Sequence, residues 1–318
     1  MIDRERDSDS NSFGFQGGLI GVETNAPNLD VNDVINESTI TGDTSTGFTF
    51  QDKTLLSDSY EADMTLNSAY VSYDALYRDQ FQMVVGVRYE DYEQITDTFD
   101  FIDNPIRSVL AESSTLPAFT FNWLSQGDQQ IRFSATQTVA RPDFKETSAA
   151  TFFDRDLNLR VEGNPNLKLS DITNYDIRWE KYWSGAESVS VAYFFKDMDD
   201  PIERVAVVTS GNVQTRTFVN APSAEISGVE FDLRKEFALN SAFTKSLFLA
   251  VNVSVLDSEV RLDDGRTRSL QGAPDYSANL IVGYDDLVRG QEFTLLFNES
   301  GDTIIDVGTE GLPDILQE

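Results

Sequence analysis

The chain contains no cysteine and no histidine among its 318 residues. Without cysteine it has no disulfide framework, no thiolate nucleophile and no Cys-ligated zinc site. Without histidine it lacks the base of the Ser-His-Asp triad and the commonest metal ligand. Basic residues are also scarce, because 24 Lys and Arg stand against 54 Asp and Glu, a formal net charge of −30. This acidity argues against a nucleic-acid partner, since phosphate binding requires an excess of Lys and Arg.

Long hydrophobic runs are missing as well. No run approaches the ~18 apolar residues that suggest a transmembrane helix, and the mean hydropathy is −0.31. The first residues, MIDRERDSDSNS, have no apolar core of the kind that a signal peptide needs. These absences alone suggest a soluble acidic protein. However, 40% hydrophobic and 11% aromatic residues are too many for an acidic disordered chain, and 22 Phe with 11 Tyr favour β-sheet over a helical bundle.

The strongest positive signal is alternation with a period of two. Between Phe81 and Tyr89 every second residue is apolar, and similar alternation occurs in 131–136, 174–180, 229–234 and 246–255. The predicted strands have roughly 10 residues or more, whereas strands of soluble proteins usually have about 5–6. We therefore expect about eleven strands, near residues 11–22, 60–77, 81–97, 114–124, 129–139, 172–183, 188–208, 214–236, 245–262, 275–284 and 292–299.

The connections between these segments alternate in length. Short turns are expected near 78–80, 125–128, 184–187, 238–244 and 285–291, and mostly longer loops near 23–59, 98–113, 140–171 and 263–274, with a short exception near 209–213. Two unlike ends are typical of a transmembrane β-barrel. Aromatic residues adjoin the short turns, as a belt at the membrane interface would, although aromatics also flank tight turns in other β proteins. They are Tyr77, Phe81, Trp123, Trp183, Phe237, Phe243, Tyr284 and Phe293.

A barrel of this kind is inside-out relative to a soluble protein. We expect the apolar set of each strand to face lipid and the polar set to face a wet lumen, so a negative mean hydropathy is compatible with membrane insertion. The expected lumen-facing residues include Arg88, Arg132, Arg178, Glu180, Glu230 and Arg234.

Several motifs occur in order along roughly residues 60–314. They are Val87-Arg88-Tyr89-Glu90, Ala140-Arg141-Pro142-Asp143-Phe144, Gly163-Asn164-Pro165-Asn166-Leu167 with Asn174-Tyr175-Asp176, Asp199-Asp200-Pro201-Ile202, Asn220-Ala221-Pro222 with Ile226-Ser227-Gly228-Val229-Glu230, and Gly311-Leu312-Pro313-Asp314. No single motif is specific, but together they resemble the barrel region of TonB-dependent outer-membrane receptors. Each also has a local meaning: Asn220-Ala221-Pro222, for example, interrupts a long strand and fits a kink at the barrel rim.

The resemblance implies an all-β fold, a partial antiparallel transmembrane barrel with about eleven of the ~22 strands of a plugged barrel. It implies active import across the outer membrane of a Gram-negative cell. Loops would bind a scarce solute (siderophore, vitamin or oligosaccharide), a plug domain would gate the barrel, and an inner-membrane energy-coupling protein would drive release.

The chain departs from the family pattern at both ends. No plug domain precedes residue 11, no coupling box is visible, and no aromatic-terminated strand follows Gln317-Glu318. We therefore expect residues 1–10 to be a loop or disordered segment and residues 11–318 to be an incomplete barrel domain without a plug.

Acidic residues form three clusters in the sequence. Oxygen-rich clusters suit divalent cations, but the spacing does not match a calcium loop, and solvated surface is the alternative. Carboxylate pairs also serve glycosidases, yet with 54 acids such pairs arise by chance. We expect no enzyme activity, no catalytic residue, no metal site and no cofactor. The clusters are Glu90, Asp91, Glu93, Asp97, Asp100 and Asp103; Asp197, Asp199, Asp200 and Glu203; and Asp263 with Asp264.

Ligand-binding residues stay unassigned. The arginines Arg88, Arg132, Arg178 and Arg234 either guide an anionic solute or pair with lumen acids such as Glu90, Glu180 and Glu230. Loop aromatics either stack on a ligand such as a sugar or pack within the loops; these are Phe99, Phe101, Phe144, Phe152 and Phe153.

Two further functions compete with the receptor. A passive porin or adhesin would use the same kind of barrel without a gate. A soluble β-rich carbohydrate-active enzyme would instead have strands nearer 5–6 residues and an apolar core shared by two sheets. A continuous outward band of apolar side chains would exclude that enzyme.

Overall fold

The computed structural model describes residues 2–8, 13–17, 40, 48–52, 54–100, 102–125, 127–154, 159–184, 187–209, 213–240, 242, 244–262, 265–308 and 313–317. They are mostly in β-strands, apart from turns and loops, a 3-10 turn, η1 (Leu56–Asp58), and a short α-helix, α2 (Phe144–Thr147). No helix among the described residues is long and apolar enough to cross a bilayer. The expected all-β class is confirmed.

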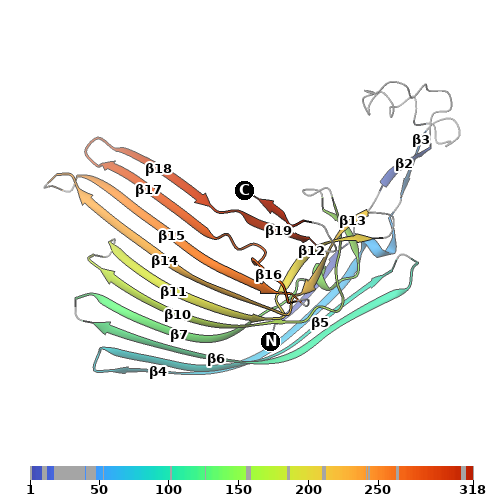
Figure 1. Ribbon diagram of the computed structural model, residues 1–318, viewed down its shortest axis with the longest axis horizontal. Helices are drawn as coiled ribbons and strands as arrows, with labels where there is room; N and C mark the ends of the chain where they lie inside the picture. The colour runs from blue at the N-terminus through green and yellow to red at the C-terminus, as the bar shows by residue number, and fades with distance from the viewer. Residues whose placement is uncertain are drawn as a thin grey trace.

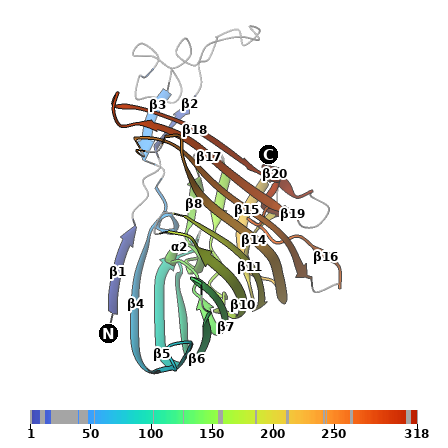
Figure 2. The ribbon, with the colours of Figure 1, turned by 90° about the vertical axis from the view of Figure 1, so that its left-hand side faces the viewer.

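Twelve strands form one antiparallel sheet, here called the main sheet. Figure 1 shows its strands side by side, and Figure 2 shows that the sheet curves into a trough with α2 inside it. Among the described residues β1 and β18 are its edges, so the sheet is open. Its order is β1 (Ile2–Ser8), β4 (Tyr60–Tyr77), β5 (Phe81–Phe99), β6 (Pro105–Ser125), β7 (Gln129–Ala140), β10 (Ser170–Tyr182), β11 (Ser188–Asp199), β14 (Ser223–Ala238), β15 (Lys245–Arg261), β17 (Tyr276–Asp286) and β18 (Gln291–Ser300), with β16 (Thr267–Arg268) beside β15.

Six shorter strands form a second sheet at the end of the main sheet opposite to the short turns (Figure 1). Two of its pairings are parallel, β12 with β19 and β13 with β9. A separate hairpin consists of β2 (Phe13–Gly17) and β3 (Phe48–Asp52). The order of the second sheet is β20 (Ile315–Gln317), β19 (Thr303–Gly308), β12 (Ile202–Thr209), β13 (Val213–Asn220), β9 (Leu159–Glu162) and β8 (Thr151–Asp154). Two segments that link neighbouring main-sheet strands, and the segment that follows β18, thus fold together into a sheet of their own.

Most long strands match the ranges expected from alternation, including β4, β5, β7, β10, β15, β17 and β18. The strand expected at 114–124 is longer, because β6 starts at Pro105, so the long loop expected at 98–113 is wrong. Residues 105–113 carry polar and charged side chains on both faces, which hides the hydrophobic alternation.

The strands expected at 188–208 and 214–236 are each divided in two at a proline. Pro201 separates β11 from β12, and Pro222 separates β13 from β14, as the predicted kink at Asn220-Ala221-Pro222 requires. The two breaks lie together, because Ala221 N donates to Pro201 O at 2.8 Å. Proline cannot donate to a sheet ladder, so both strands leave the main sheet at this point.

The N-terminal segment differs from its prediction. Residues 1–10 are expected to be a loop or disordered segment, but Ile2–Ser8 form β1 and pair with β4, while residues 1, 9 and 10 lie outside the described residues. Their sequence alternates acids with bases instead of polar with apolar residues, so hydrophobic periodicity does not show the strand. Of the strand expected at 11–22, Phe13–Gly17 form β2, and the remaining positions lie outside the described residues.

Candidate functional site

The outer face of the main sheet is apolar near the short turns. In β5 the alternate residues from Met83 to Tyr89 are exposed, while those between them are half-buried. The span from Phe81 to Tyr89 covers about 27 Å along the strand, which a tilt of ~40° reduces to about 21 Å, close to the ~25 Å band of outer-membrane barrels. Exposed members of this apolar band in other strands are Val71, Tyr73, Phe121, Trp123, Phe133, Tyr175, Ile177, Trp179, Val191, Tyr193, Val229, Phe231, Val255, Phe293, Leu295 and Phe297.

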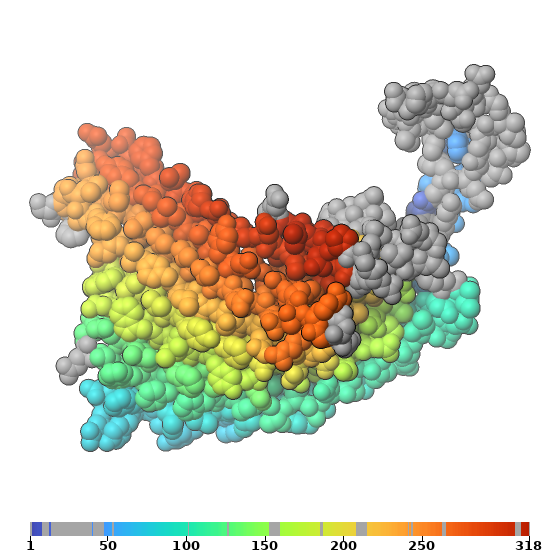
Figure 3. All heavy atoms as spheres, viewed as in Figure 1, coloured from blue at the N-terminus to red at the C-terminus, as the bar shows by residue number. Residues whose placement is uncertain are grey.

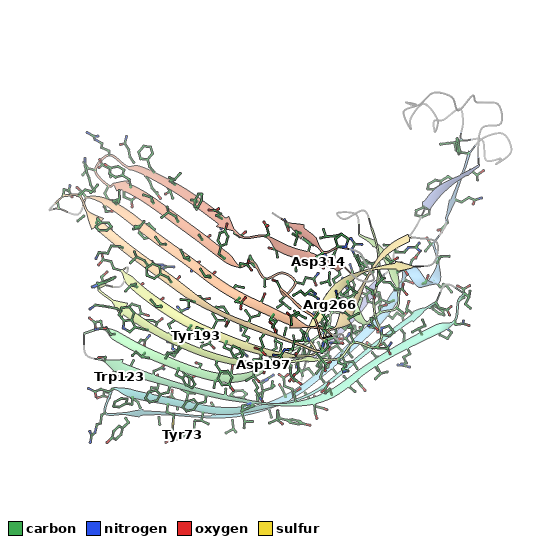
Figure 4. All side chains as sticks on the ribbon, in the orientation of Figure 1. Tyr73, Trp123, Tyr193, Asp197, Arg266 and Asp314 are labelled. Carbon is green, nitrogen blue, oxygen red and sulfur yellow. The ribbon has the colours of Figure 1, made fainter. Side chains whose placement is uncertain are left out.

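The same face becomes charged farther from the short turns. In β5 the outward side changes from Tyr89 to Asp91, and in β15 it changes from Val255 to Asp257. Figure 4 shows the change in β11, where Asp197 lies farther from the short turns than Tyr193. Figure 3 shows the strands as adjacent colour bands, so the outward positions of neighbours form a continuous surface. Lipid contact is therefore possible only over the apolar band.

The border between apolar and charged positions drifts steadily across the sheet. Following the strand pairing from β15 back to β5, Asp257 aligns with Val85, whereas the first outward charge of β5 is Asp91. This offset is about 20 Å along the strands, accumulated over six strand spacings of about 4.8 Å each. It corresponds to a strand tilt of about 35°, within the range of transmembrane barrels.

Aromatic side chains lie at the short-turn end of the band, where the sequence places them. Tyr77, Trp123, Trp183, Phe237 and Phe293 are all exposed there. The ring centroids of Tyr284 and Phe293 are 6.3 Å apart across β17 and β18. Phe243, which belongs to the same prediction, lies outside the described residues. Exposed Trp and Tyr at the edge of an apolar band suit the membrane–water interface.

The inner face carries a ladder of polar side chains from β4 to β18. On one side, Gln82 Nε2 donates to Asp74 (3.0 Å), and Asn122 Nδ2 donates to Gln82 Oε1 (3.0 Å). Arg132 Nε then donates to Asn122 Oδ1 at 3.1 Å. On the other side, one hydrogen bond joins each neighbouring pair in the series Asp232, Asn252, Asn279 and Asn298. The inner face is therefore suited to water or polar contacts along its whole width.

Ion pairs and a hydrogen bond lie between the two sides of this ladder. Arg178 Nη2 donates to Glu230 Oε2 at 2.8 Å, and Ser190 Oγ donates to Asp232 Oδ2 at 3.1 Å. Arg132 Nη2 lies 3.9 Å from Glu180 Oε2. These contacts lie on the inner face near the middle of the sheet.

The contacts decide between the two roles predicted for the arginines. Arg88 Nε lies 2.5 Å from Glu90 Oε1, and Arg132 and Arg178 have the partners just described, so pairing with lumen acids is confirmed for all three. The described residues give Arg234 no ion-pair partner. A role in guiding a solute is thus not needed to explain Arg88, Arg132 or Arg178.

The Arg141-Pro142-Asp143-Phe144 motif ends β7 and starts α2. Asp143 Oδ1 accepts from Phe144 N at 2.6 Å, and Glu146 Oε2 accepts from Asp143 N at 2.8 Å, which makes a capping box. Phe144 is buried with Tyr60, Ala62 and Ala150. Of the two roles predicted for the loop aromatics, packing therefore applies to Phe144.

The Gly163-Asn164-Pro165 motif folds against the end of α2. A Cβ on Gly163 would lie 2.0 Å from Ser148 O and 2.4 Å from Lys145 O, so a larger residue does not fit without movement. Asn164 N donates to Glu146 O at 2.6 Å, and Asn164 Nδ2 donates to Phe218 O of β13 at 2.9 Å. This motif fastens the second sheet to α2.

Asn220 makes a similar joint at the paired prolines. Its Oδ1 accepts from Lys168 N at 2.9 Å, and its Nδ2 donates to Asp200 O at 2.7 Å. Lys168 Nζ lies 3.1 Å from Asp200 Oδ1. Several of the motifs that carry the family resemblance are therefore joints between the two sheets.

The second sheet contains buried charged residues whose ion-pair partners the sequence alone does not indicate. Asp306 accepts from Arg216 Nε at 2.7 Å and from Arg204 Nε at 2.5 Å, and the side chains of Arg216 and Asp306 are each 1% exposed. Glu203 is equally buried and pairs with Arg268. The one available signal is a lone charge inside short apolar runs such as Thr303–Val307.

The acidic clusters of the sequence are divided in the structure. Glu90 is buried on the inner face, whereas Asp91 and Glu93 are exposed on the outer face, because neighbouring residues of a strand point to opposite sides. Asp263 and Asp264 lie outside the described residues. Over the part of the chain that the structure describes, no group of three or more acids could hold a metal ion. Solvated surface accounts for the outward acids.

Two glutamates beside the second sheet are half-buried, and burial raises the pKa of Glu146 and of Glu162. The hydrogen bond from Asp143 N opposes the rise at Glu146, and the charge of Arg160 opposes it at Glu162. A raised pKa often marks a proton-transfer group. Here the Glu146 carboxylate is engaged in the capping box of α2, so its place is structural.

Comparison with solved structures identifies proteins of the same fold. The siderophore receptor PiuA from Acinetobacter baumannii is 12% identical with a TM-score of 0.59, and the match covers 86% of this chain and 38% of PiuA. The FrpB iron transporter from Neisseria meningitidis (F3-3 variant) is 13% identical with a TM-score of 0.55, covering 85% of this chain and 42% of FrpB. The alcaligin outer-membrane receptor FauA from Bordetella pertussis is 13% identical with a TM-score of 0.53, covering 79% and 40%.

The chain thus spans about two fifths of the length of these three structures. A search of curated protein sequences gives no match. The model of the family described as "TonB dependent receptor-like, beta-barrel" matches residues 3–311, which is nearly the whole chain. This match agrees with the apolar outer band, the polar inner face and the strand tilt. The chain belongs to the TonB-dependent receptor β-barrel family, whose members are non-enzymatic transporters of the Gram-negative outer membrane.

Proposed function

We propose that this protein is the barrel of an outer-membrane receptor that takes up a scarce solute by energy-coupled transport. The observation that carries the proposal is the division of the main sheet into an apolar outer band and a hydrogen-bonded polar inner face. The band suits lipid, and the inner face suits a lumen filled by water or by a polar domain. The outward band also excludes a carbohydrate-active enzyme with a core shared by two sheets.

The solute that we propose is a siderophore, a vitamin or an oligosaccharide, with a siderophore favoured. PiuA and FauA are described as a siderophore receptor and an alcaligin receptor, and FrpB as an iron transporter. With 12–13% identity these likenesses establish the fold, and fold does not determine the solute. These likenesses make a siderophore the first solute to test.

The partners that we propose follow from the family resemblance. A plug domain would occupy the trough against the polar ladder of the inner face. An inner-membrane energy-coupling protein would act on that plug, so the barrel itself would make no direct contact with the energy source.

The test is uptake by cells of the native host that have or lack the full-length protein. Accumulation of ⁵⁵Fe-ferrichrome, ⁵⁷Co-cobalamin and ¹⁴C-maltohexaose would be followed with and without a protonophore. We expect loss of the protein to abolish uptake of one of these solutes, and the protonophore to abolish the same uptake in the parent cells.

The outcomes separate the receptor from its alternatives. Uptake that depends on the protein but resists the protonophore would indicate a passive porin. Unchanged uptake of all three solutes, with loss of cell attachment, would indicate an adhesin. Recovery of the full-length protein as a folded monomer without detergent would contradict both kinds of barrel.

A further inference from the structure

Strand β1 sorts its charges by face. Arg4 pairs with Met64 and Arg6 pairs with Ala62 of β4. Ala62 belongs to the cluster around Phe144 inside the trough, and Met64 packs against that cluster. Since paired residues point to the same side of a sheet, both arginines lie on the inner face. The acids between them, in the sequence Asp3-Arg4-Glu5-Arg6-Asp7, therefore lie on the outer face.

These arginines line a cavity of about 310 Å³ inside the trough. Its walls come from β1, from Tyr92 and Gln94 of β5, and from Arg141 at the end of β7. Small-molecule sites usually have volumes of ~300–1,000 Å³, so the cavity is large enough for a small ligand. We call it the arginine pocket.

Arg141, the third arginine of the pocket, makes only some of the hydrogen bonds that its guanidinium group can donate to the described residues. Arg141 Nη2 donates to Glu90, and its guanidinium carbon lies 4.9 Å from the centroid of the Tyr92 ring. The Nε of Arg141 is buried, and the described residues give it no hydrogen-bond partner. Glu90 also accepts from Arg88 Nε, so one carboxylate serves two guanidinium groups. A buried donor without a partner costs free energy that a ligand acceptor would recover.

The positive charge of the pocket exceeds its negative charge. Arg6 Nη1 lies 3.8 Å from Asp143 Oδ1, but both side chains are exposed to solvent, so this pair is weak. The described residues give Arg4 no ion-pair partner. Among the described residues that line the pocket, three arginines stand against one acid, Asp143, in a chain whose net charge is −30. This excess of positive charge favours a negatively charged ligand over a neutral one.

We propose that the arginine pocket binds a small solute that carries two or more carboxylate or phosphate groups. Guanidinium groups match both kinds of group, because their planar forks donate paired hydrogen bonds to them. Arg4 and Arg6 hold the open side of the anion, and Arg141 Nε donates from the buried side. That this anion is the imported solute rests on the proposed function, whereas its binding does not.

The binding test uses the full-length protein in detergent and isothermal titration with citrate, with pyrophosphate, and with sorbitol as a neutral control. We expect saturable binding of at least one anion, weakening as NaCl is raised, and none of sorbitol. Preference for citrate or for pyrophosphate identifies the anionic group. Absence of saturable binding of both anions to the unchanged protein would overturn the proposal.

Matched variants locate the site. The double substitution Arg4→Gln with Arg6→Gln should weaken anion binding by about tenfold or more. The control, Arg107→Gln with Arg261→Gln, removes the same two charges from exposed ion pairs with Asp97 and Glu225. It should change binding by less than about twofold. Equal losses in both doubles would show a general charge effect and would contradict the pocket.

A third variant tests the buried donor. Arg141→Lys keeps the charge but removes Nε, so anion binding should weaken while the thermal midpoint changes little. Unchanged affinity would remove Arg141 from the site. Uptake in cells is measured separately. Anion binding without energy-dependent uptake would support the arginine pocket and refute the proposed transporter. Energy-dependent uptake without anion binding would support the transporter and refute the arginine pocket.

Discussion

The main sheet and the second sheet place their charges in opposite ways. In the main sheet the ion pair of Arg178 with Glu230 lies on the inner face and remains partly exposed, while the apolar side chains of the band point outward. In the second sheet Arg216 and Asp306 are fully buried, beside an apolar cluster of Val205, Ile304 and Val307. The first arrangement requires lipid around it, whereas the second is that of a small water-soluble protein.

This difference shows how one chain is adapted to lipid in one region and to water in another. The apolar band ends where the outward face becomes acidic, and the second sheet lies at that end of the molecule. Partly exposed ion pairs contribute ~0–1 kcal/mol each, whereas loss of one partner from a buried pair costs about 3–5 kcal/mol. The two regions should therefore respond very differently to the same kind of substitution.

The largest effect is expected in the second sheet. Asp306→Asn removes the carboxylate that Arg204 and Arg216 share, and should destabilise this sheet by about 3–5 kcal/mol because buried charges lose their partner. Hydrogen exchange of β12 and β19 measures the loss. The matched control is Glu230→Gln in the main sheet, expected to cost less than about 1 kcal/mol. Equal effects would refute the contrast between the sheets.

The next effect concerns the apolar band. Val85→Arg places a charge against lipid and should destabilise insertion into vesicles by about 2–4 kcal/mol, as lipid-facing arginines do in outer-membrane barrels. Asp91→Arg changes the same face of the same strand beyond the band and should cost little. Urea unfolding of the full-length protein in vesicles compares them. Similar costs would place the border of the band elsewhere.

A smaller effect is expected at the joint between the sheets. Gly163→Ala puts a methyl group against carbonyl oxygens of α2 and should cost about 1–3 kcal/mol, as overpacking does. Gly283→Ala is the control, since its Cβ would meet its neighbours at 3.7–3.8 Å, an ordinary contact. The thermal midpoint reports both. If Gly283→Ala lowered the thermal midpoint as much as Gly163→Ala, crowding at the joint would not be the cause of the destabilisation.

The smallest effect depends on pH. Because burial raises the pKa of Glu146, the folded state favours its protonated form, and stability is lost as pH rises through the folded pKa. At pH 7 the Glu146→Gln variant should therefore protect α2 from hydrogen exchange better than the unchanged protein does. Below about pH 4, which is lower than the pKa of glutamate in the unfolded chain, the two should protect α2 equally well. Hydrogen exchange at the Ser148 amide, which caps α2, measures this. Slower exchange in the unchanged protein than in the Glu146→Gln variant at pH 7 would contradict this prediction.

Sequence patterns predict the regular part of the fold and fail where another rule replaces hydrophobic alternation. The strands from Phe81 and Lys245 are visible because lipid on one side and water on the other impose alternation. Strand β1 is hidden because its alternation is between acid and base. The second sheet is hidden because its short strands lie in segments expected to be loops or continuations of longer strands, and the paired breaks at Pro201 and Pro222 meet only in space.

The candidate site follows the same division. Pairing of Arg88, Arg132 and Arg178 with inner acids is predictable, because alternate residues of adjacent strands share a face. The arginine pocket is not, because Arg4 and Arg141 are distant in sequence and meet only through the pairing of β1 with β4 and the turn into α2. Register and tertiary contacts, which one sequence does not specify, bring them together.

The central claim, a tilted sheet with lipid outside, is tested most directly by membrane depth at two aligned positions. Val85 and Asp257 have the same register across the sheet but lie on opposite sides of the drifting border. Since the chain has no cysteine, Val85→Cys and Asp257→Cys would each give one spin-label site within it. In vesicles, the label at position 85 should be relaxed mainly by oxygen and the label at position 257 mainly by a water-soluble nickel chelate. Equal depth for both labels would contradict the account.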